Sequence, residues 1–266
     1  MINISNDLRE SIIGIATDAG RAIMDIYQDH FQVQIKADMS PLTQADLAAH
    51  KIIMHGLKQL TPNLPVLSEE SPERTWKERG CWTSYWLVDP LDGTREFIKR
   101  NGEFCVNIAL IHEGIPVYAV ILAPVEGTIW YAMHGEQAFR RDGNRDTTLH
   151  VQVPAARSLR VAVSRSHLDA QTAALLTHMK ETTLVSQGSA LKFCRLAEGT
   201  LDVYPRLGTT AEWDTAAGQC VLHAAGGALL SIETGKPLCY NRRETLLNSG
   251  FIALGDTTLP WRDWLA

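Results

Sequence analysis

The chain has 266 residues, of which 45% are hydrophobic and 21% are charged, which is ordinary for a globular protein. This composition excludes a disordered chain, and the length allows either one large core or two unequal lobes. The formal net charge of -5 and the absence of long Lys/Arg runs argue against binding to nucleic acid polymers, whose phosphates require a basic surface.

The cysteines and the apolar runs indicate the cellular compartment of the protein. The cysteines are odd in number and show no Cys-x-x-Cys spacing, so we expect reduced thiols in the cytoplasm rather than disulfides or a zinc site. The longest apolar run, 117–125, is too short for a bilayer, and charges near the N-terminus argue against a signal peptide. We therefore expect no integral membrane segment. Peripheral attachment to the cytoplasmic face of the inner membrane stays open, as does the choice between a monomer and a homodimer.

Two amphipathic helices are predicted near the start of the chain. Apolar residues recur at helical spacing over 7–27, and this stripe predicts a helix that packs on the core. A second helix is predicted over 43–59, and it is expected to bury Leu47 and Leu57. Asp46 lies in its first turn, where a carboxylate commonly only complements the helix dipole.

A short strand over 65–68 is predicted to lead into two acids, Glu69 and Glu70. Adjacent side chains on a pleated segment face opposite ways, so only one of these acids can face a site that the segment helps to form. The other is expected to be solvated. The polar connection 72–80, Arg79 included, is expected to be a solvent-facing mixture of charges.

Two carboxylates follow the apolar run 85–88. We expect a buried strand that ends at Asp89, because the proline after it cannot donate to a sheet. Asp89 and Asp92, with the Leu91 carbonyl between them, supply only oxygen ligands, which suit magnesium or manganese and do not suit zinc. The stretch therefore predicts a site for a hard cation.

Gly93 and Thr94 add a place for an anion. Glycine adopts backbone angles closed to other residues, so the Thr94 amide could point outward at the start of the following segment, 95–99. Metal and phosphate together are typical of magnesium-dependent phosphoryl transfer. The alternative is a plain surface turn, because Pro-x-Asp-Gly is also a good turn sequence.

An antiparallel meander is predicted next. Four apolar runs separated by short turns cover 104–111, 116–123, 128–133 and 137–141. Short turns of this kind join antiparallel neighbours. The polar segment 143–158 has no sustained periodicity and predicts a boundary between an N-terminal lobe, 1–150, and a C-terminal lobe, 151–266.

Strands and helices alternate in the remaining third, which predicts an α/β lobe with ligand groups at the carboxyl ends of its strands. The expected strands cover 159–163, 183–186, 201–205 and 228–232, and the expected helices cover 169–179, 189–198 and 214–225. Polar residues follow three of these strands, at 164–167, 187–192 and 204–206. Asp214 stands at the start of the last helix, as a cap or as a ligand.

These stretches resemble a known family. Residues 68–70, 86–94 and 213–217 are similar, in this order, to the signatures of the inositol monophosphatase superfamily of magnesium-dependent, lithium-sensitive phosphatases. The strings at 36–41, 97–104, 189–194 and 204–206 resemble its 3'(2'),5'-bisphosphate nucleotidase branch of CysQ type. The resemblance covers nearly the whole chain. It implies an inositol monophosphatase-like α+β fold, a layered αβαβα sandwich with an antiparallel N-terminal sheet and a smaller C-terminal α/β lobe.

The resemblance also implies a metal site and a pair of residues that activate water. It assigns two or more Mg2+ ions, for which Mn2+ can substitute, to Glu69, Asp89, the Leu91 carbonyl, Asp92 and Asp214. Thr94, hydrogen-bonded to Asp46, would orient and help deprotonate the attacking water. The loop 36–43 would be a mobile loop over the site, with Asp38 as a late metal contact.

The implied substrate is a small nucleotide. The residues assigned to contact it are Glu69, Leu91, Asp92, Gly93, Thr94, His167, Ser189, Lys192, Arg206 and Asp214. The implied reaction is hydrolysis of the 3'-phosphate of 3'-phosphoadenosine 5'-phosphate (PAP) to AMP and phosphate, with its sulfated analogue PAPS as a further substrate, in sulfur metabolism. Without the family, Lys192, Arg206 and His167 would be interpreted as ordinary surface residues. The alternatives are an inositol or sugar-phosphate phosphatase of the same superfamily and a non-catalytic nucleotide- or metal-binding protein.

Overall fold

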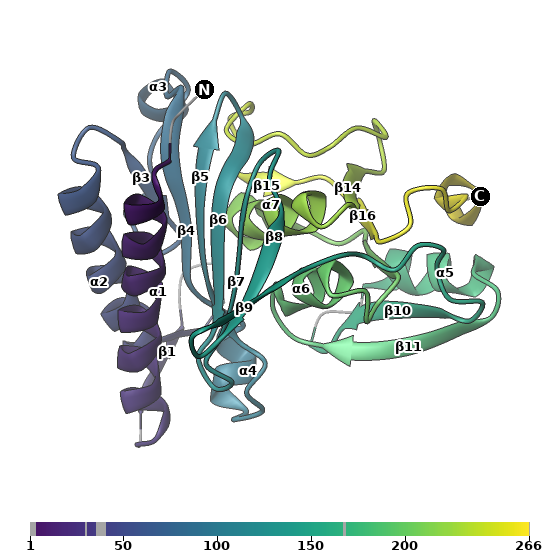
Figure 1. The fold of residues 1–266 in the computed structure, drawn as a ribbon, viewed down its shortest axis with the longest axis horizontal. Helices are drawn as coiled ribbons and strands as arrows, with labels where there is room; N and C mark the ends of the chain where they lie inside the picture. The colour runs from purple at the N-terminus through teal and green to yellow at the C-terminus, as the bar shows by residue number, and fades with distance from the viewer. Residues whose placement is uncertain (1–3, 30, 36–40, 167–168, 266) are drawn as a thin grey trace.

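The computed structural model describes residues 4–29, 31–35, 41–166 and 169–265, and its elements form five layers (Figure 1). Two helices cover one face of a seven-stranded sheet, two more separate this sheet from a five-stranded sheet, and a further pair covers the outer face of the second sheet. Three buried clusters fill the spaces between the layers. The predicted αβαβα sandwich is confirmed.

The first layer consists of α1 (Asn6–Tyr27) and α2 (Gln44–Leu60), which pack on the large sheet as their apolar stripes predicted. Thr43 caps α2, and Asp46 accepts a hydrogen bond from the Thr43 backbone in return, which forms a capping box. The expectation that Leu47 is buried is wrong, since 37% of its surface is exposed. The buried stripe is formed instead by Ala45, Ala49 and Ile53, and Leu47 lies on a different face of the helix.

The large sheet follows the order β3-β4-β5-β6-β7-β8-β9. Its strands are β3 (Val66–Ser68), β4 (Ser84–Asp92), β5 (Cys105–His112), β6 (Ile115–Ala123), β7 (Thr128–Met133), β8 (Ala138–Asp142) and β9 (Arg145–Thr148). From β4 onward each strand pairs antiparallel with the next, so the predicted meander is confirmed, whereas β3 runs parallel to β4. The strand β9 lies in the segment that the sequence marked as a boundary, and the division at residue 150 stays a prediction.

The prediction that the central strand ends at Asp89 is wrong. Strand β4 continues to Asp92, and its register with β5 shifts between Asp89 and Asp92. This irregularity accommodates Pro90, because a bulge does not need the backbone N–H that proline lacks. Two ionisable side chains therefore stand on a bent strand rather than in a surface turn.

The second sheet follows the order β11-β10-β12-β16-β14. Its strands are β10 (Leu159–Ser164), β11 (Thr182–Gln187), β12 (Val203–Arg206), β14 (Ala228–Ser231) and β16 (Phe251–Leu254). The layer between the sheets contains α6 (Leu191–Ala197) and α7 (Ala216–Ala224), and the outer layer contains α5 (Ala170–His178) and the 3-10 helix η2 (Trp261–Leu265). The sequence predicted four of these strands but not β16, which runs antiparallel between β12 and β14.

Short elements complete the fold. They are the hairpin of β1 (Val33–Ile35) and β2 (Pro41–Thr43), the pair of β13 (Thr210–Ala211) and β15 (Leu247–Asn248), the helices α3 (Trp76–Arg79) and α4 (Thr94–Ile98), and the 3-10 helix η1 (Glu212–Asp214). No helix among the described residues has both the length and the apolar character that crossing a membrane requires.

Arg79 is buried, so the expectation that it faces solvent is wrong. Its guanidinium donates to the Asn241 side-chain oxygen at 2.6 Å and to the backbone carbonyls of Arg243 and Glu244. Asn241 donates in return to the Arg79 carbonyl at 2.7 Å. A charge-rich segment therefore anchors a distant loop, because carbonyl dipoles and an amide satisfy the buried cation.

Candidate active site

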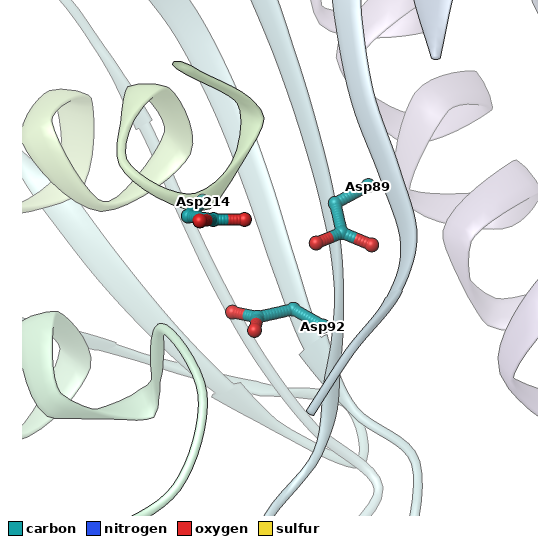
Figure 2. Close-up of side chains that lie close together, drawn as sticks. All are labelled: Asp89, Asp92 and Asp214. Carbon is teal, nitrogen blue, oxygen red and sulfur yellow. The ribbon is translucent and has the colours of Figure 1, made fainter. Parts of the chain in front are cut away.

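Three aspartate carboxylates face one another where β4 meets η1 (Figure 2). Asp89 and Asp92 come from the bent end of β4, and Asp214 comes from η1. Each offers a carboxylate oxygen, and these oxygens lie within 4.8 Å of one another. The structure thus brings together acids that are far apart in the sequence, as the metal-site hypothesis requires.

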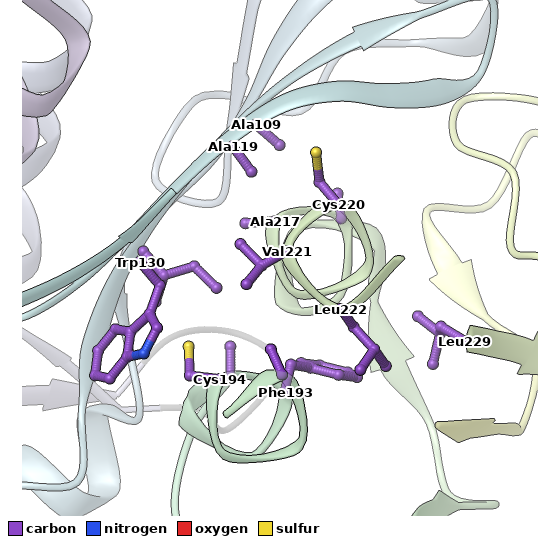
Figure 3. Packing of buried hydrophobic residues seen from close by; sticks show 14 of the residues in the cluster. Ala109, Ala119, Trp130, Phe193, Cys194, Ala217, Cys220, Val221, Leu222 and Leu229 are labelled. Carbon is purple, nitrogen blue, oxygen red and sulfur yellow. The ribbon is translucent and has the colours of Figure 1, made fainter. Parts of the chain in front are cut away.

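The position of Asp214 depends on the packing of α7, which follows it directly. The small residues of α7 face both the large sheet and α6 in the central cluster (Figure 3). At Gly218 an added Cβ would lie 2.2 Å from the Phe193 ring, so the two helices approach too closely for any side chain there. The small-residue sequence therefore permits the close packing that places Asp214 opposite β4.

Backbone and side-chain donors orient each carboxylate. The Leu91 amide donates to Asp89 at 3.0 Å, and the Ala211 amide donates to Asp214 at 2.8 Å. Asp92 accepts from the Asn107 side chain at 3.2 Å and from the Ala190 amide at 2.6 Å. These bonds hold the acids in place against their mutual repulsion.

The electrostatics of this cluster favour a bound cation. Burial raises the pKa of Asp89 and Asp214 well above the usual range, and the neighbouring negative charges raise it further. Burial also raises the pKa of Asp92, to about 6, although the Lys192 charge acts in the opposite direction. Buried carboxylates of this kind need positive charge beside them in order to ionise together. An all-oxygen donor set of acids, with Asp89 buried and Asp92 and Asp214 half-buried, fits a hard divalent ion.

Glu69 joins the same cavity from the turn that follows β3. It lines the cavity with the three aspartates, and its charge contributes to the raised pKa of Asp89. Glu70 is not among the residues that line this cavity. The reason for expecting only one of the two acids to face the site is wrong, because both lie in a turn and not on a pleated strand. The expectation that the other acid is solvated is also wrong, since Glu70 is half-buried.

Thr94 and Asp46 form the predicted hydrogen bond. The Thr94 hydroxyl donates to Asp46 Oδ1 at 3.1 Å and lies 3.3 Å from the Leu91 carbonyl. Gly93, whose φ of 94° is left-handed, turns the chain from β4 into α4 and allows this approach. Burial raises the pKa of Asp46, while hydrogen bonds from Thr43 and Thr94 lower it.

The cavity beside the acids has a volume of about 290 Å³. Its lining also includes Ser189, Lys192 and Arg206, three of the residues expected to contact substrate. His167, another of them, lies outside the described residues, as does Asp38. The structure thus brings the remaining candidates to one cavity.

Lys192 is buried, so its interpretation as plain surface charge is wrong. Its ammonium donates to the Ser189 carbonyl at 2.6 Å and to the Gln187 carbonyl at 3.1 Å, and it lies 5.0 Å from the centre of the Tyr204 ring. Burial lowers the pKa of Lys192 to about 8, although the Asp92 charge raises it. These contacts hold a cation in the cavity lining, within the electrostatic reach of Asp92.

Sequence reasoning missed two groups that hold Asp92. Asn107 stands in an otherwise apolar strand, and a lone amide in a buried run could have indicated a polar partner. The Ala190 amide has no such signal, because any residue supplies a backbone N–H. Only the path of the chain brings it to Asp92.

With this site in place, the class of protein is defined: the chain belongs to the inositol monophosphatase family, whose model matches residues 6–258. Members of this family are metal-dependent, which agrees with the acidic cluster. The chain is 49% identical over 244 residues to 3'(2'),5'-bisphosphate nucleotidase CysQ of Escherichia coli strain K12, covering 91% of this chain and 97% of that one. It is 37% identical over 264 residues to the protein of the same name from Haemophilus influenzae, covering 98% of both chains.

A solved structure gives the same result. The crystal structure of CysQ from Bacteroides thetaiotaomicron, described as a bacterial member of the inositol monophosphatase family, superimposes with a TM-score of 0.81 at 39% identity. The match covers 92% of this chain and 96% of that one. Inositol monophosphatase of Thermotoga maritima matches with a TM-score of 0.78 at 23% identity, which supports the fold alone.

Proposed function

We propose that this chain is a Mg2+-dependent 3'(2'),5'-bisphosphate nucleotidase that hydrolyses the 3'-phosphate of PAP to give AMP and phosphate. The observation that carries the proposal is one cavity lined both by the acid cluster and by two cations, Lys192 and Arg206. High identity to proteins named CysQ supports the same assignment. PAPS, which shares the two phosphorylated positions, is a second candidate substrate.

The metal proposal rests on the chemistry of the donors. Glu69, Asp89, Asp92 and Asp214, together with the Leu91 carbonyl, offer oxygens only, and we assign them to two Mg2+ ions. Such ions neutralise phosphate charge and make water acidic enough to act as a nucleophile near neutral pH.

We assign the activation of water to Thr94 and Asp46. The Thr94 hydroxyl donates its own proton to Asp46, which leaves its oxygen available to accept a proton from a water molecule in the cavity. Asp46 is buried, and its raised pKa makes it a better acceptor than an exposed aspartate. The Gly93 and Thr94 amides, at the cavity wall, are assigned to the phosphate oxygens.

We assign the second phosphate to the part of the cavity lined by Ser189, Lys192 and Arg206. PAP carries a 5'-phosphate that inositol monophosphate lacks, and a buried phosphate needs cations or N–H donors. Lys192 and Arg206 supply the cations, and Ser189 supplies a hydroxyl. The assignment of His167 to the nucleotide stays a prediction.

A substrate panel tests the proposal. Phosphate release is measured from PAP, PAPS, inositol 1-phosphate and 3'-AMP, each with Mg2+, with Mn2+ and with a chelator. We expect PAP to be hydrolysed with the highest kcat/KM and all turnover to stop in the chelator. An equal or higher kcat/KM on inositol 1-phosphate would favour the broader phosphatase, and no turnover on any ester would favour a non-catalytic binding protein.

A further inference from the structure

We propose that Glu103 is a positioning residue that determines the preference for a substrate with two phosphates, because it holds the turn whose carbonyls accept from the Lys192 ammonium. Glu103 lies in the loop between α4 and β5, and the turn, residues 187–190, joins β11 to α6. This inference rests on the proposed function. It adds a residue that makes no contact of its own with the substrate.

The Glu103 carboxylate binds two separate parts of the second sheet's edge. Its Oε2 accepts the Gly188 backbone N–H at 2.7 Å and the Arg165 Nε at 2.6 Å, and its Oε1 accepts the Arg165 Nη2 at 2.7 Å. Arg165 also donates to the Ser186 carbonyl at 2.7 Å. One acid therefore holds the ends of β10 and β11 against the loop that follows α4.

The contact at Gly188 leaves no room for a side chain. A Cβ at this position would lie 2.6 Å from the Glu96 Cγ and 2.7 Å from the Glu103 carbonyl oxygen. The backbone carbonyl cannot rotate away as a flexible side chain can. The turn thus approaches the loop as closely as backbone atoms allow, and the carboxylate bond is made at the point of closest approach.

The turn held in this way contacts both an acid of the cluster and the Lys192 ammonium. Its Ala190 amide donates to Asp92 at 2.6 Å, while its Ser189 and Gln187 carbonyls accept from the Lys192 ammonium. Ser189 has a φ of 50°, a left-handed conformation that a non-glycine residue keeps only where its surroundings hold it. A displacement of the turn would therefore move the Lys192 ammonium, while the Asn107 side chain still holds Asp92.

The consequence differs between substrates. The scissile phosphate lies at the acid cluster, whereas the second phosphate depends on Lys192. Loss of the Glu103 contact should weaken binding of a bisphosphate and spare the chemistry at the cluster. We expect the effect mainly in KM and only for substrates that carry the second phosphate.

The experiment compares PAP with 3'-AMP, which lacks the 5'-phosphate, in Mg2+. For Glu103→Leu we expect KM for PAP to rise roughly tenfold, the loss of one charge-assisted hydrogen bond, with kcat on PAP and kcat/KM on 3'-AMP within about threefold of wild type. Glu103→Gln keeps an acceptor for the Gly188 N–H, so its KM for PAP should be close to that of wild type. Gly188→Ala keeps the Glu103 carboxylate but places a Cβ against the Glu103 backbone carbonyl, which forces the turn and the loop apart, so it should reproduce the Glu103→Leu result.

Arg165→Leu is the comparison variant, because it removes the exposed ion pair and the bond to the Ser186 carbonyl and leaves the Glu103 bond to Gly188. We expect KM for PAP to change by less than about twofold in this variant, because exposed ion pairs contribute little. Equal losses of kcat/KM on PAP and on 3'-AMP in Glu103→Leu would overturn this inference and leave the proposed function standing. An Arg165→Leu effect as large as that of Glu103→Leu would do the same. A wild-type enzyme with no preference for PAP over 3'-AMP would overturn the proposed function instead.

Discussion

The Thr94 hydroxyl and the Asp46 carboxylate lie 3.1 Å apart, although 48 positions separate them in the chain. The other oxygen of Asp46 accepts from the Thr43 backbone at 2.8 Å and from its hydroxyl at 2.5 Å, at the start of α2. One buried acid therefore caps a helix and holds the hydroxyl that faces the cavity. Through this double use the start of α2 positions the hydroxyl to which we assign the activation of water.

Removal of the Thr94 hydroxyl should lower kcat and spare binding. For Thr94→Val we expect kcat on PAP to fall roughly a hundredfold or more, the usual effect of losing a general base. For Asp46→Asn we expect a similar fall in kcat. The double variant should have a kcat only slightly lower than either single variant, because both residues serve one step. Steady-state kinetics on the three variants provide the measurement.

The control for this prediction is Thr43→Ala, which removes the helix cap and leaves Thr94 in place. It should lower the free energy of unfolding by about 1 kcal/mol and reduce kcat far less than Thr94→Val does. A Thr94→Val enzyme with kcat within threefold of wild type would contradict the assignment.

Addition of Mg2+ should stabilise the folded protein without substrate. A concentration of about one hundred times Kd should raise the free energy of unfolding by about 2.7 kcal/mol. Asp214→Asn should lose most of this increment. In chelator the same variant should be at least as stable as wild type, because it relieves repulsion among buried carboxylates. Thermal unfolding with Mg2+ and with chelator measures both effects, and an undiminished Mg2+ increment in the variant would remove Asp214 from the metal site.

Arg206 should matter only for the second phosphate. Arg206→Gln is expected to raise KM for PAP roughly tenfold, through the loss of a charge-assisted contact, and to leave kcat/KM on 3'-AMP nearly unchanged. Arg21→Gln, which removes an exposed arginine of α1 that pairs with Asp18, is the matched control and should leave both substrates unaffected. Parallel losses on PAP and 3'-AMP would show that Arg206 serves the fold or the scissile phosphate instead.

His223 should make stability depend on pH. Burial lowers the pKa of His223 from 6.5 to about 4, and its Nε2 accepts the Leu229 N–H at 2.9 Å. Because the unfolded state binds the proton more readily, the contribution to stability is complete above pH 6.5 and is lost as the pH falls toward 4. A shift of this size corresponds to at most about 3 kcal/mol.

Urea unfolding at pH 7 and at pH 4.5 measures this contribution. His223→Gln offers an uncharged acceptor to Leu229, so it should lose less stability between the two pH values than wild type does. An identical loss in the two proteins would show that other groups account for the acid sensitivity.

Local patterns were enough for much of the fold. The stripe of α1, the alternating strands of the meander and the turns between them all report which face of an element is buried, and this follows from spacing along the chain alone. The position of β16 was not predictable in this way. The position of a strand between β12 and β14 is determined by long-range pairing, and the residues of the strand itself do not indicate which partners it will have.

By itself, the sequence determined the family and the all-oxygen donor set, because acids and glycine at fixed short spacing carry their chemistry with them. Only the tertiary structure decided that Arg79 and Lys192 are buried and that Glu103 reaches Gly188. The sequence does not show whether water or carbonyl groups surround a charged side chain. Its environment depends on segments that fold against it from elsewhere in the chain, and these contacts decide what the charge can do.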